Sequence, residues 1–227
     1  MSLIICSICG NDEFEDTTIL WPALIEEWEI STEEADYINR QQGTHCVRCK
    51  ANLRGVALGN AIREVVGTGE PLTRFVKTSS AGRLRVLDIN GTAASEVLSA
   101  LPGYVRADYP DVDMQAMPFK AASFDVVIHS DTLEHVPRPL DGLKECRRIL
   151  APNGHLCYTV PIIVGRMTRN RQNLRPSYHG NPEESGYDFI VQTEFGADAW
   201  TFPLQAGFSS VKINTVSFPA ATALTAC

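Results

Sequence analysis

Short apolar runs separated by polar turns mark out the larger part of this chain. Residues 85–89 and 124–130 are rich in branched apolar side chains and too short for helices, which is typical of strands buried on both faces of a sheet. A further short strand is expected at 104–107. Residues 140–150 instead place leucine and isoleucine at helical spacing, and another strand-like run follows at 155–160. This alternation predicts an α/β fold with a Rossmann-like, doubly wound and mostly parallel sheet.

Flanking segments extend the pattern in both directions. We expect an amphipathic helix at 57–66 that ends at Gly67, because glycine commonly follows the last turn of a helix. Three further elements are expected after the core of the sheet: a strand at 188–192, a helix around 197–205 and a strand at 211–216. The tail at 219–227 shows no such pattern, so we expect the final strand of the sheet to be rearranged or cut off.

Cysteine spacing sets the N-terminal part apart. Four of the seven cysteines form two Cys-x-x-Cys pairs, Cys6 with Cys9 and Cys46 with Cys49. Two residues between thiolates allow a tight turn to direct both sulfurs at one ion, and two such turns supply the four thiolates that Zn²⁺ favours. We therefore expect a structural Zn²⁺ site, with a disulfide pair or unrelated thiols as the alternatives. His45 is expected to be a loop histidine rather than a substitute ligand.

The stretch between the cysteine pairs is acidic and partly helical. Residues 12–36 carry ten acidic side chains and no basic one. Leu24 and Trp28 follow helical spacing, and Ser31 with Glu34 forms a capping-box pattern that opens a second helix. Such a surface either binds a partner or is a solvated helix face that packs its tryptophans on the neighbouring domain, and we favour the second interpretation.

Length and charge narrow the class of protein. The 227 residues suffice for an α/β domain, expected at 56–227, after a zinc-binding module with a helical insertion, expected at 1–55. A net charge of −7 argues against a dedicated nucleic-acid binder. The chain has no uninterrupted apolar stretch long enough for a membrane span and no secretory signal pattern, so we expect a soluble cytoplasmic protein.

One segment carries a recognisable chemistry. Residues 118–137 read PFKAASFDVVIHSDTLEHVP, and they precede a predicted helix that ends in RRIL and a turn at Pro152, Asn153 and Gly154. In these features the chain strongly resembles the class I S-adenosylmethionine-dependent methyltransferases, in particular the type 11 group. The resemblance covers roughly residues 84–217 and implies a methyltransferase domain that uses S-adenosylmethionine.

The loop after the first predicted strand departs from the family pattern. Asp88 matches the acid of the family pattern, and the resemblance implies that it lies at the methionine part of the cofactor. In the family pattern, one residue separates this acid from a Gly-x-Gly-x-Gly loop. Asn90, Thr92 and Ala94 occupy the three glycine positions here, and Gly91 lies one position off. Asparagine tolerates positive φ and alanine is small. We therefore expect the loop to keep its shape and to place Asp88, Asn90 and Gly91 at the cofactor.

The resemblance implies further cofactor contacts along the chain. Asp108 ends the second predicted strand, and Asp113 follows so closely that the usual intervening helix is expected to be lost or shrunken. Either carboxylate fits the position that binds ribose hydroxyls, and the choice stays open. Met114 resembles the apolar residue beside the adenine, and Ser130 and Leu133 lie where the crevice of such a sheet is expected.

Catalytic residues leave a weaker signal. Methyl transfer from a sulfonium requires mainly positioning and an unprotonated acceptor, so at most one general base is expected. His135 is the candidate base, with a structural role in its loop as the alternative. A dinucleotide oxidoreductase shares the architecture but would show G-x-G-x-x-G after the first strand, and this chain does not.

The acceptor is suggested by a local reversal of charge. Residues 146–182 contain six arginines and no acid, and Arg166, Arg169, Arg171 and Arg175 lie where this fold commonly covers the acceptor. Guanidinium groups suit anionic acceptors, and a basic loop that pairs with the acidic module is the alternative. We expect methyl transfer to a small molecule or a glycan. An RNA methyltransferase that grips RNA through the zinc module, and a non-catalytic relative that binds without transfer, are the rival functions.

Overall fold

A computed structural model describes residues 4–178 and 190–227. The N-terminal elements are β1 (Phe14–Glu15), α1 (Pro22–Glu27), α2 (Thr32–Gly43), β2 (His45–Cys46), α3 (Leu53–Val65), α4 (Leu72–Phe75) and the 3₁₀ turn η1 (Ala81–Arg83). The central elements are β3 (Arg85–Ile89), α5 (Ser95–Leu98), β4 (Gly103–Ala107), β5 (Phe124–Ser130), the 3₁₀ turn η2 (Leu133–His135), α6 (Pro139–Ile149) and β6 (Leu150–Thr159). The last elements are β7 (Ile162–Ile163), β8 (Arg169–Asn170), β9 (Thr193–Gly196), α7 (Thr201–Gln205), β10 (Val211–Val216) and β11 (Ala221–Ala226).

A six-stranded sheet organises the chain, in the order β10-β11-β6-β5-β3-β4. The strands β4, β3, β5 and β6 run parallel, whereas β11 is antiparallel to both β6 and β10. The chain leaves β3 toward β4 on one side and returns to β5 on the other. At such a switch point the connections diverge and leave a crevice beyond the carboxyl ends of the strands. The predicted α/β fold with a mostly parallel sheet is confirmed.

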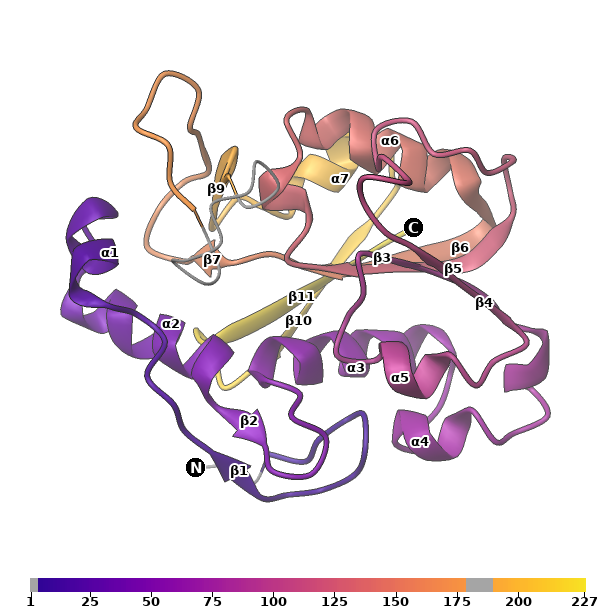
Figure 1. Cartoon of the computed structure of the whole chain (residues 1–227). Coiled ribbons are helices and arrows are strands. Elements are labelled where there is room, and N and C mark those ends of the chain that lie inside the picture. Colours follow the sequence, from indigo (N-terminus) through magenta and orange to yellow (C-terminus); the bar gives the residue numbers. More distant parts are fainter. Residues whose placement is uncertain (1–3, 179–189) are drawn as a thin grey trace.

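Helices cover both faces of this sheet (Figure 1). Alternate residues of a strand point to opposite faces, so Val86 packs in the buried cluster that contains α3, while Leu87 packs in the cluster that contains α6 and α7. Since both faces of β3 and β5 are covered, their near-continuous apolar sequences are explained. In the part of the chain that the structure describes, no helix is both long and apolar enough to cross a membrane.

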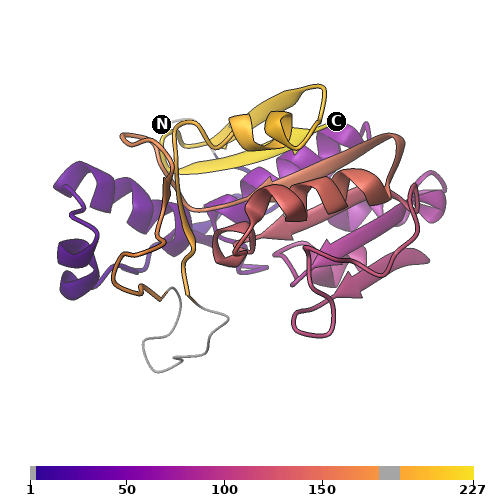
Figure 2. The same ribbon diagram turned by 90° about the horizontal axis from the view of Figure 1, so that it is seen from above.

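The N-terminal segment shares its core with the sheet. Cys6, Ile8 and Trp28 belong to the same buried cluster as Val86 of β3. Figure 2 shows α1 and α2 at one end of the molecule, next to the small sheet of β7, β9 and β8. The acidic insertion thus lies against the segment that follows β6, and Trp28 donates a hydrogen bond from Nε1 to Ser177 Oγ at 2.7 Å.

Local capping explains where the first helices begin. The Ser31 side chain accepts from the Glu34 amide and the Glu34 carboxylate accepts from the Ser31 amide, so the predicted capping box of α2 is confirmed. The next helix, α3, begins at Leu53 rather than near residue 57, because the Asn52 side chain accepts from the Gly55 amide. This earlier start brings Arg54 into the buried part of the molecule.

The predicted turn at residues 152–154 lies inside β6. Phe124 pairs with Leu150 and Val126 pairs with His155, so four residues of β6 bulge outward opposite a single residue of β5. Asn153 adopts a φ of 64° in this bulge, a conformation that asparagine tolerates. The predicted strand began at residue 155, whereas β6 begins at Leu150.

The prediction for the C-terminal tail is wrong. Residues 221–226 form β11, which inserts between β10 and β6. The strand was not recognised because alanines fill its buried positions and give no strong alternation; Ala221, Ala223 and Ala226 are fully buried. The predicted strand at 188–192 lies partly outside the described residues, and its described part is not a strand, since β9 begins at Thr193; likewise α7 spans only the end of the predicted helix.

Candidate active site and metal centre

The four paired cysteines come together in one cluster. Their sulfur atoms all lie within 4.8 Å of one another, with Cys6 Sγ 3.5 Å from Cys49 Sγ and Cys9 Sγ 3.6 Å from Cys46 Sγ. A tetrahedral ion with sulfur ligands at about 2.3 Å sets sulfurs about 3.8 Å apart. None of the seven cysteines, all of which lie in the described ranges, forms a disulfide. The donor set and its spacing therefore fit a four-thiolate metal centre.

Two equivalent turns build this cluster. Gly10 donates from its amide to the Cys6 carbonyl, and Lys50 donates to the Cys46 carbonyl, at 2.8 Å and 2.9 Å. The residue that closes each turn has positive φ, 81° at Gly10 and 59° at Lys50. His45 lies apart from the sulfurs and bonds Glu15 and the Gly43 carbonyl, so the prediction that it is not a ligand agrees with its position.

A crevice of about 530 Å³ opens at the switch point of the sheet. Its walls come from the loops after β3, β4 and β5, and they include Asn90, Asp108, Asp113, Met114, Thr132 and His135. The lining combines carboxylates with apolar Met114 and Val136, which suits a molecule with hydroxyl groups and a flat ring. Asp108 is paired with Arg106 at 2.7 Å, and Asp113 accepts from the Gln115 amide at 2.8 Å.

The loop after β3 keeps a glycine-like shape without the glycine pattern. Asn90 adopts a φ of 58° and Gly91 a φ of 75°, as the sequence interpretation of asparagine allowed. The Asn90 side chain accepts from the Tyr109 amide at 2.8 Å, which ties this loop to the one after β4. A side chain at position 91 would collide with the Arg106 guanidinium, 2.3 Å from its Cβ. Gly91 and Ser130 line a shallow depression that adjoins the crevice at Asn90 and Asp131.

Two residues expected at the cofactor do not reach the crevice wall. Asp88 is fully buried beneath the loop, where its Oδ2 accepts from Ser95 Oγ at 2.5 Å and from Tyr104 OH at 2.8 Å. Burial raises the pKa of Asp88 above its ordinary value. Leu133 is also fully buried and packs in the core on the α6 face. Both side chains shape the loops around the crevice rather than line it.

His135 lies in η2, on the wall of the crevice. Its Nδ1 is 3.0 Å from the Ile190 carbonyl, so Nδ1 carries the proton that is donated and Nε2 is the acceptor nitrogen of the neutral ring. Burial lowers the pKa of His135. The ring is therefore neutral near pH 7, the form in which an imidazole accepts a proton.

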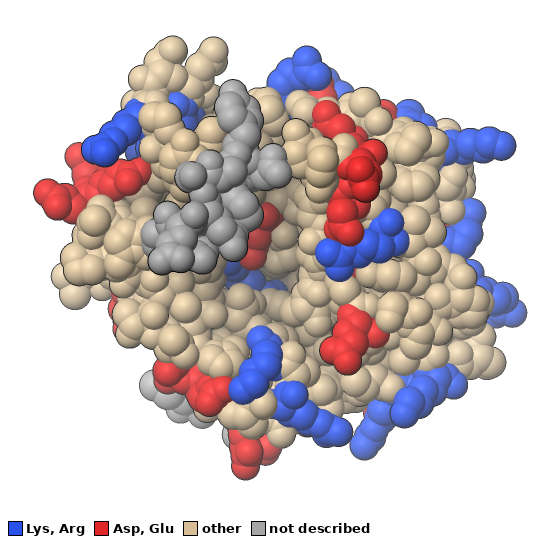
Figure 3. Space-filling model, in the orientation of Figure 1, with Lys and Arg blue, Asp and Glu red and all other residues tan. Residues whose placement is uncertain are grey.

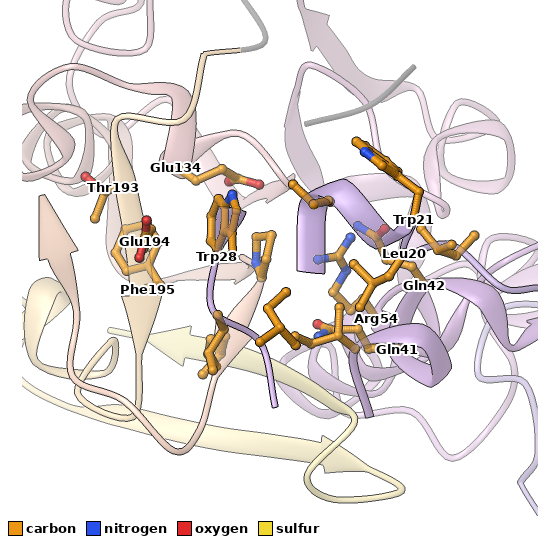
Figure 4. A pocket seen from close by; sticks show the side chains of 17 residues that line it. Leu20, Trp21, Trp28, Gln41, Gln42, Arg54, Glu134, Thr193, Glu194 and Phe195 are labelled. Carbon is orange, nitrogen blue, oxygen red and sulfur yellow. The ribbon is translucent and has the colours of Figure 1, made fainter. Parts of the chain in front are cut away.

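A second cavity, of about 350 Å³, also borders η2, where Glu134 contributes to its lining (Figure 4). Its walls are mainly apolar and come from the N-terminal segment and the β7 to β9 region: Leu20, Trp21, Leu24, Trp28, Ile162 and Phe195. Arg54 and Glu134 contribute charged groups to the same cavity. In the orientation of Figure 1, the space-filling view in Figure 3 shows a hollow near the centre of the molecule, with acidic and basic side chains visible in it.

Neighbouring residues of η2 thus face different cavities. Glu134 lines the apolar cavity and is 1% exposed, while His135 lines the crevice. Arg54 Nη2 lies 3.0 Å from Asp131 Oδ2, and Asp131 lines the crevice. The crevice and the apolar cavity therefore adjoin at these four residues.

The arginines predicted to meet the acceptor are mostly paired with acids. Arg166 bonds Glu34 through two nitrogens, at 2.9 Å each. Arg169 and Arg171 both bond Glu194. The Arg166 pair agrees with the alternative in which the basic loop pairs with the acidic N-terminal segment, whereas Glu194 belongs to β9. Residues 179–182, the end of the predicted basic stretch, lie outside the described residues.

Sequence reasoning missed the apolar cavity and the role of Arg54. Trp28 and Phe195 are far apart in the chain, so no local pattern connects them. Trp28 nevertheless packs as expected, since it is 6% exposed and lies under the Arg171 guanidinium at 5.1 Å, whereas Trp21 is only partly buried. Arg54 carried no signal, because the start of α3 was placed after it.

The family described as "Methyltransferase domain" matches residues 65–158. The ubiquinone/menaquinone biosynthesis C-methyltransferase UbiE of Ruegeria sp. is 34% identical over 93 residues, which cover 40% of this chain and 37% of that protein. Its counterpart from Paracoccus denitrificans is 29% identical over 168 residues, 66% of each chain.

Two solved structures are also similar to parts of this chain, at lower identity. The carbon methyltransferase CurJ is 16% identical, with 90% of this chain and 69% of that chain covered and a TM-score of 0.44. A possible histamine N-methyltransferase of Thermotoga maritima is 15% identical, with 68% and 86% covered and a TM-score of 0.39. The chain spans about 37% of the length of the relative from Ruegeria.

Proposed function

We propose that this chain, whose residues 65–158 form a class I S-adenosylmethionine-dependent methyltransferase domain, transfers the sulfonium methyl group of S-adenosylmethionine to a small apolar acceptor. One observation carries the proposal. A crevice lined by several carboxylates and an apolar cavity both border η2, so that a cofactor and an acceptor can be held next to each other. Methyl transfer requires mainly that its two reactants are held in line and close together.

The crevice residues suit the parts of the cofactor. Asp108 and Asp113 offer carboxylates for ribose hydroxyls, and Met114 and Val136 offer apolar surface for adenine. Asn90 and Gly91 bring the backbone close to the methionine end, with Ser130 at the adjoining depression. When bound there, S-adenosylmethionine supplies an electrophilic methyl group. The chain's own contribution is to bind, to orient and to exclude water. We keep His135 as the candidate base, because its neutral ring presents Nε2 as a proton acceptor.

The acceptor is proposed to be a small molecule with a ring. Trp28, Ile162 and Phe195 line a cavity whose volume, about 350 Å³, suits a compact ring system. The relatives named above carry names of ubiquinone and menaquinone biosynthesis, which are ring compounds. A glycan is not proposed, because the cavity is mainly apolar and the nearby arginines are paired with acids. The same pairing disfavours a grip on RNA.

A zinc ion at the four cysteines is the second part of the proposal. Four thiolates complete a tetrahedral shell and leave no open position, so the ion would be structural. It would cross-link the two turns at Cys6–Cys9 and Cys46–Cys49, which flank the segment that walls the acceptor cavity. We also propose the division into a zinc-binding module, 1–55, and a methyltransferase domain, 56–227, with the module as part of the acceptor site.

Calorimetric titration of S-adenosylmethionine tests the cofactor site. The metal-loaded protein should bind it, and Asp113→Ala should weaken binding about tenfold, because one hydrogen bond to a charged group contributes roughly 1.5 kcal/mol. Asp111→Ala is the matched control, since Asp111 lies in the same loop, is exposed and has the same charge. Absence of binding by the unaltered protein would instead favour a non-catalytic relative.

A further inference from the structure

Two buried polar groups in the apolar cavity have hydrogen-bonding capacity that the described residues do not use. Nε and Nη1 of Arg54 have no acceptor, and neither carboxyl oxygen of Glu134 has a hydrogen-bond partner. Arg54 and Glu134 are each 1% exposed. A buried polar group without a partner costs roughly 1–3 kcal/mol, so such a pair at one end of a cavity points to a ligand.

The charges around this pair are nearly balanced before a ligand enters. Asp131 neutralises Arg54 through Nη2 at 3.0 Å. His135 Nε2 lies 3.8 Å from Glu134 Oε1 and belongs to a neutral ring. Glu194 also lines the cavity, but Arg169 and Arg171 neutralise it. Burial first, and then the Asp131 charge, raise the pKa of Glu134 well above its ordinary value, which favours the protonated, neutral form of its carboxyl group.

A neutral carboxyl group and a guanidinium form two kinds of donor directed at one space. Figure 4 shows the polar ends of Arg54 and Glu134 turned into the cavity beside Trp28. Protonated glutamic acid donates one hydrogen bond, and charge-assisted bonds from arginine to an anionic oxygen are among the strongest in proteins. The surrounding walls are the apolar rings of Trp28 and Phe195.

Resting on the proposed function, we propose that Arg54 and Glu134 bind the anionic oxygen of an apolar, ring-bearing acceptor, a phenolate or a carboxylate. Arg54 donates to the oxygen from the nitrogens that Asp131 does not engage, and Glu134 donates from its carboxyl group. The ring occupies the space among Trp28, Ile162 and Phe195. The acceptor is therefore recognised by an oxyanion at one end and by ring packing at the other.

Three simple probes separate the chemistry of the oxygen from that of the ring. Benzoate, 4-nitrophenolate and neutral benzamide are titrated into the protein at pH 7 and above. We expect at least one of the two anions to bind tenfold or more tighter than benzamide, and the preferred anion identifies the acceptor class. Equal affinity for all three probes would overturn the proposal.

Substitutions test the two donors. Glu134→Gln keeps a donor and should bind the preferred anion within about threefold of the unaltered protein, whereas Glu134→Leu should lose about tenfold. Arg54→Met should abolish the preference for anions, and Arg54→Lys should keep part of it. If Glu134→Gln loses as much as Glu134→Leu, or if Arg54→Met keeps the preference, the assignment is wrong.

A pH series adds a readout that a purely structural role would not change. Benzoate binding should weaken as rising pH ionises Glu134, because two anions would then share the site, and Glu134→Gln should remove that dependence. S-adenosylmethionine titration of the same samples serves two purposes. It shows that each variant is folded, and its failure in the unaltered protein would contradict the proposed function while leaving the anion site to be judged by the probes.

Discussion

At the scale of single residues, His129 illustrates how burial alone sets a charge state. The ring lies inside β5, stacks on Tyr158 with centroids 4.7 Å apart, and has no hydrogen-bond partner on either nitrogen among the described residues. Burial lowers the pKa of His129 from 6.5 to about 3. The residue therefore contributes as a neutral ring in the core, despite its position one residue before the end of a functional strand.

This burial predicts a specific loss of stability in acid. Between pH 6.5 and pH 3 the unfolded chain binds a proton at His129 that the folded chain does not. The free energy of unfolding should therefore fall by about 1.4 kcal/mol for each pH unit in that range through this residue. Above pH 6.5 the residue should have no effect on the pH dependence.

Urea unfolding of His129→Phe and the unaltered protein at pH 7.5, 6 and 5 measures this contribution. Phenylalanine retains a ring to stack on Tyr158 and cannot bind a proton. The difference in unfolding free energy between the two proteins should shift toward the variant as pH falls. Parallel pH curves would show that another group accounts for the acid sensitivity.

Asn90 supports a second prediction at the residue scale. Its φ of 58° suits asparagine and glycine but is costly for a β-branched residue. Asn90→Gly and Asn90→Val both lose the hydrogen bond from the Tyr109 amide, so their difference isolates the backbone. Asn90→Val should be less stable than Asn90→Gly by about 1–2 kcal/mol and should bind S-adenosylmethionine more weakly. Thermal unfolding and calorimetry of both variants provide the check, and equal behaviour would contradict the loop geometry.

At the scale of elements, local patterns were predictable and distant contacts were not. The strands β3 and β5 and the capping box of α2 follow from neighbouring residues, so the sequence identified them. β11 was not predicted because buried alanines give little contrast between the two faces of a strand. The apolar cavity escaped because it joins α1 to β9, and only the folded chain brings Trp28 and Phe195 together.

Arg166 links the helices α1 and α2 of the acidic N-terminal segment to the chain that follows β7. Its guanidinium bonds Glu34 of α2 and the backbone carbonyls of Trp28 and Glu29 at the end of α1. The Arg166 hydrogen bond is the largest cause that lowers the pKa of Glu34 to about 2. Arg166→Met should therefore loosen α1 and lower the free energy of unfolding by about 1–3 kcal/mol. It should also weaken the binding of the aromatic probes, while S-adenosylmethionine still binds.

Arg74→Met provides the control for that change. Arg74 pairs with Glu70 on an exposed surface, where an ion pair contributes roughly 0–1 kcal/mol. Thermal unfolding and probe titration should show little effect. If Arg166→Met behaves like Arg74→Met, α1 is held by its apolar contacts alone.

At the scale of the whole molecule, the metal centre and the acceptor cavity belong to one continuous core. Cys6 and Cys46 lie in the same buried cluster as Leu24 and Trp28, whose side chains wall the cavity, and as Val86 of the central sheet. The crevice, by contrast, is walled by the loops after β3, β4 and β5 and by Gln192. Loss of the metal should therefore affect the two spaces unequally.

Removal of the metal is expected to separate acceptor binding from cofactor binding. Without an ion, the clustered thiols lose the bonds that hold their turns, and the segment between them loses its anchor at both ends. Chelator treatment should release one zinc ion per chain and lower the midpoint of thermal unfolding. It should weaken the binding of the aromatic probes tenfold or more, whereas the affinity for S-adenosylmethionine should change by less than about threefold. Cys9→Ser should reproduce this pattern, while Cys227→Ser, at an exposed cysteine outside the cluster, should leave all four measurements unchanged. Equal loss of both ligands on chelation would show instead that the metal stabilises the whole core, and the module could not then be assigned specifically to the acceptor site.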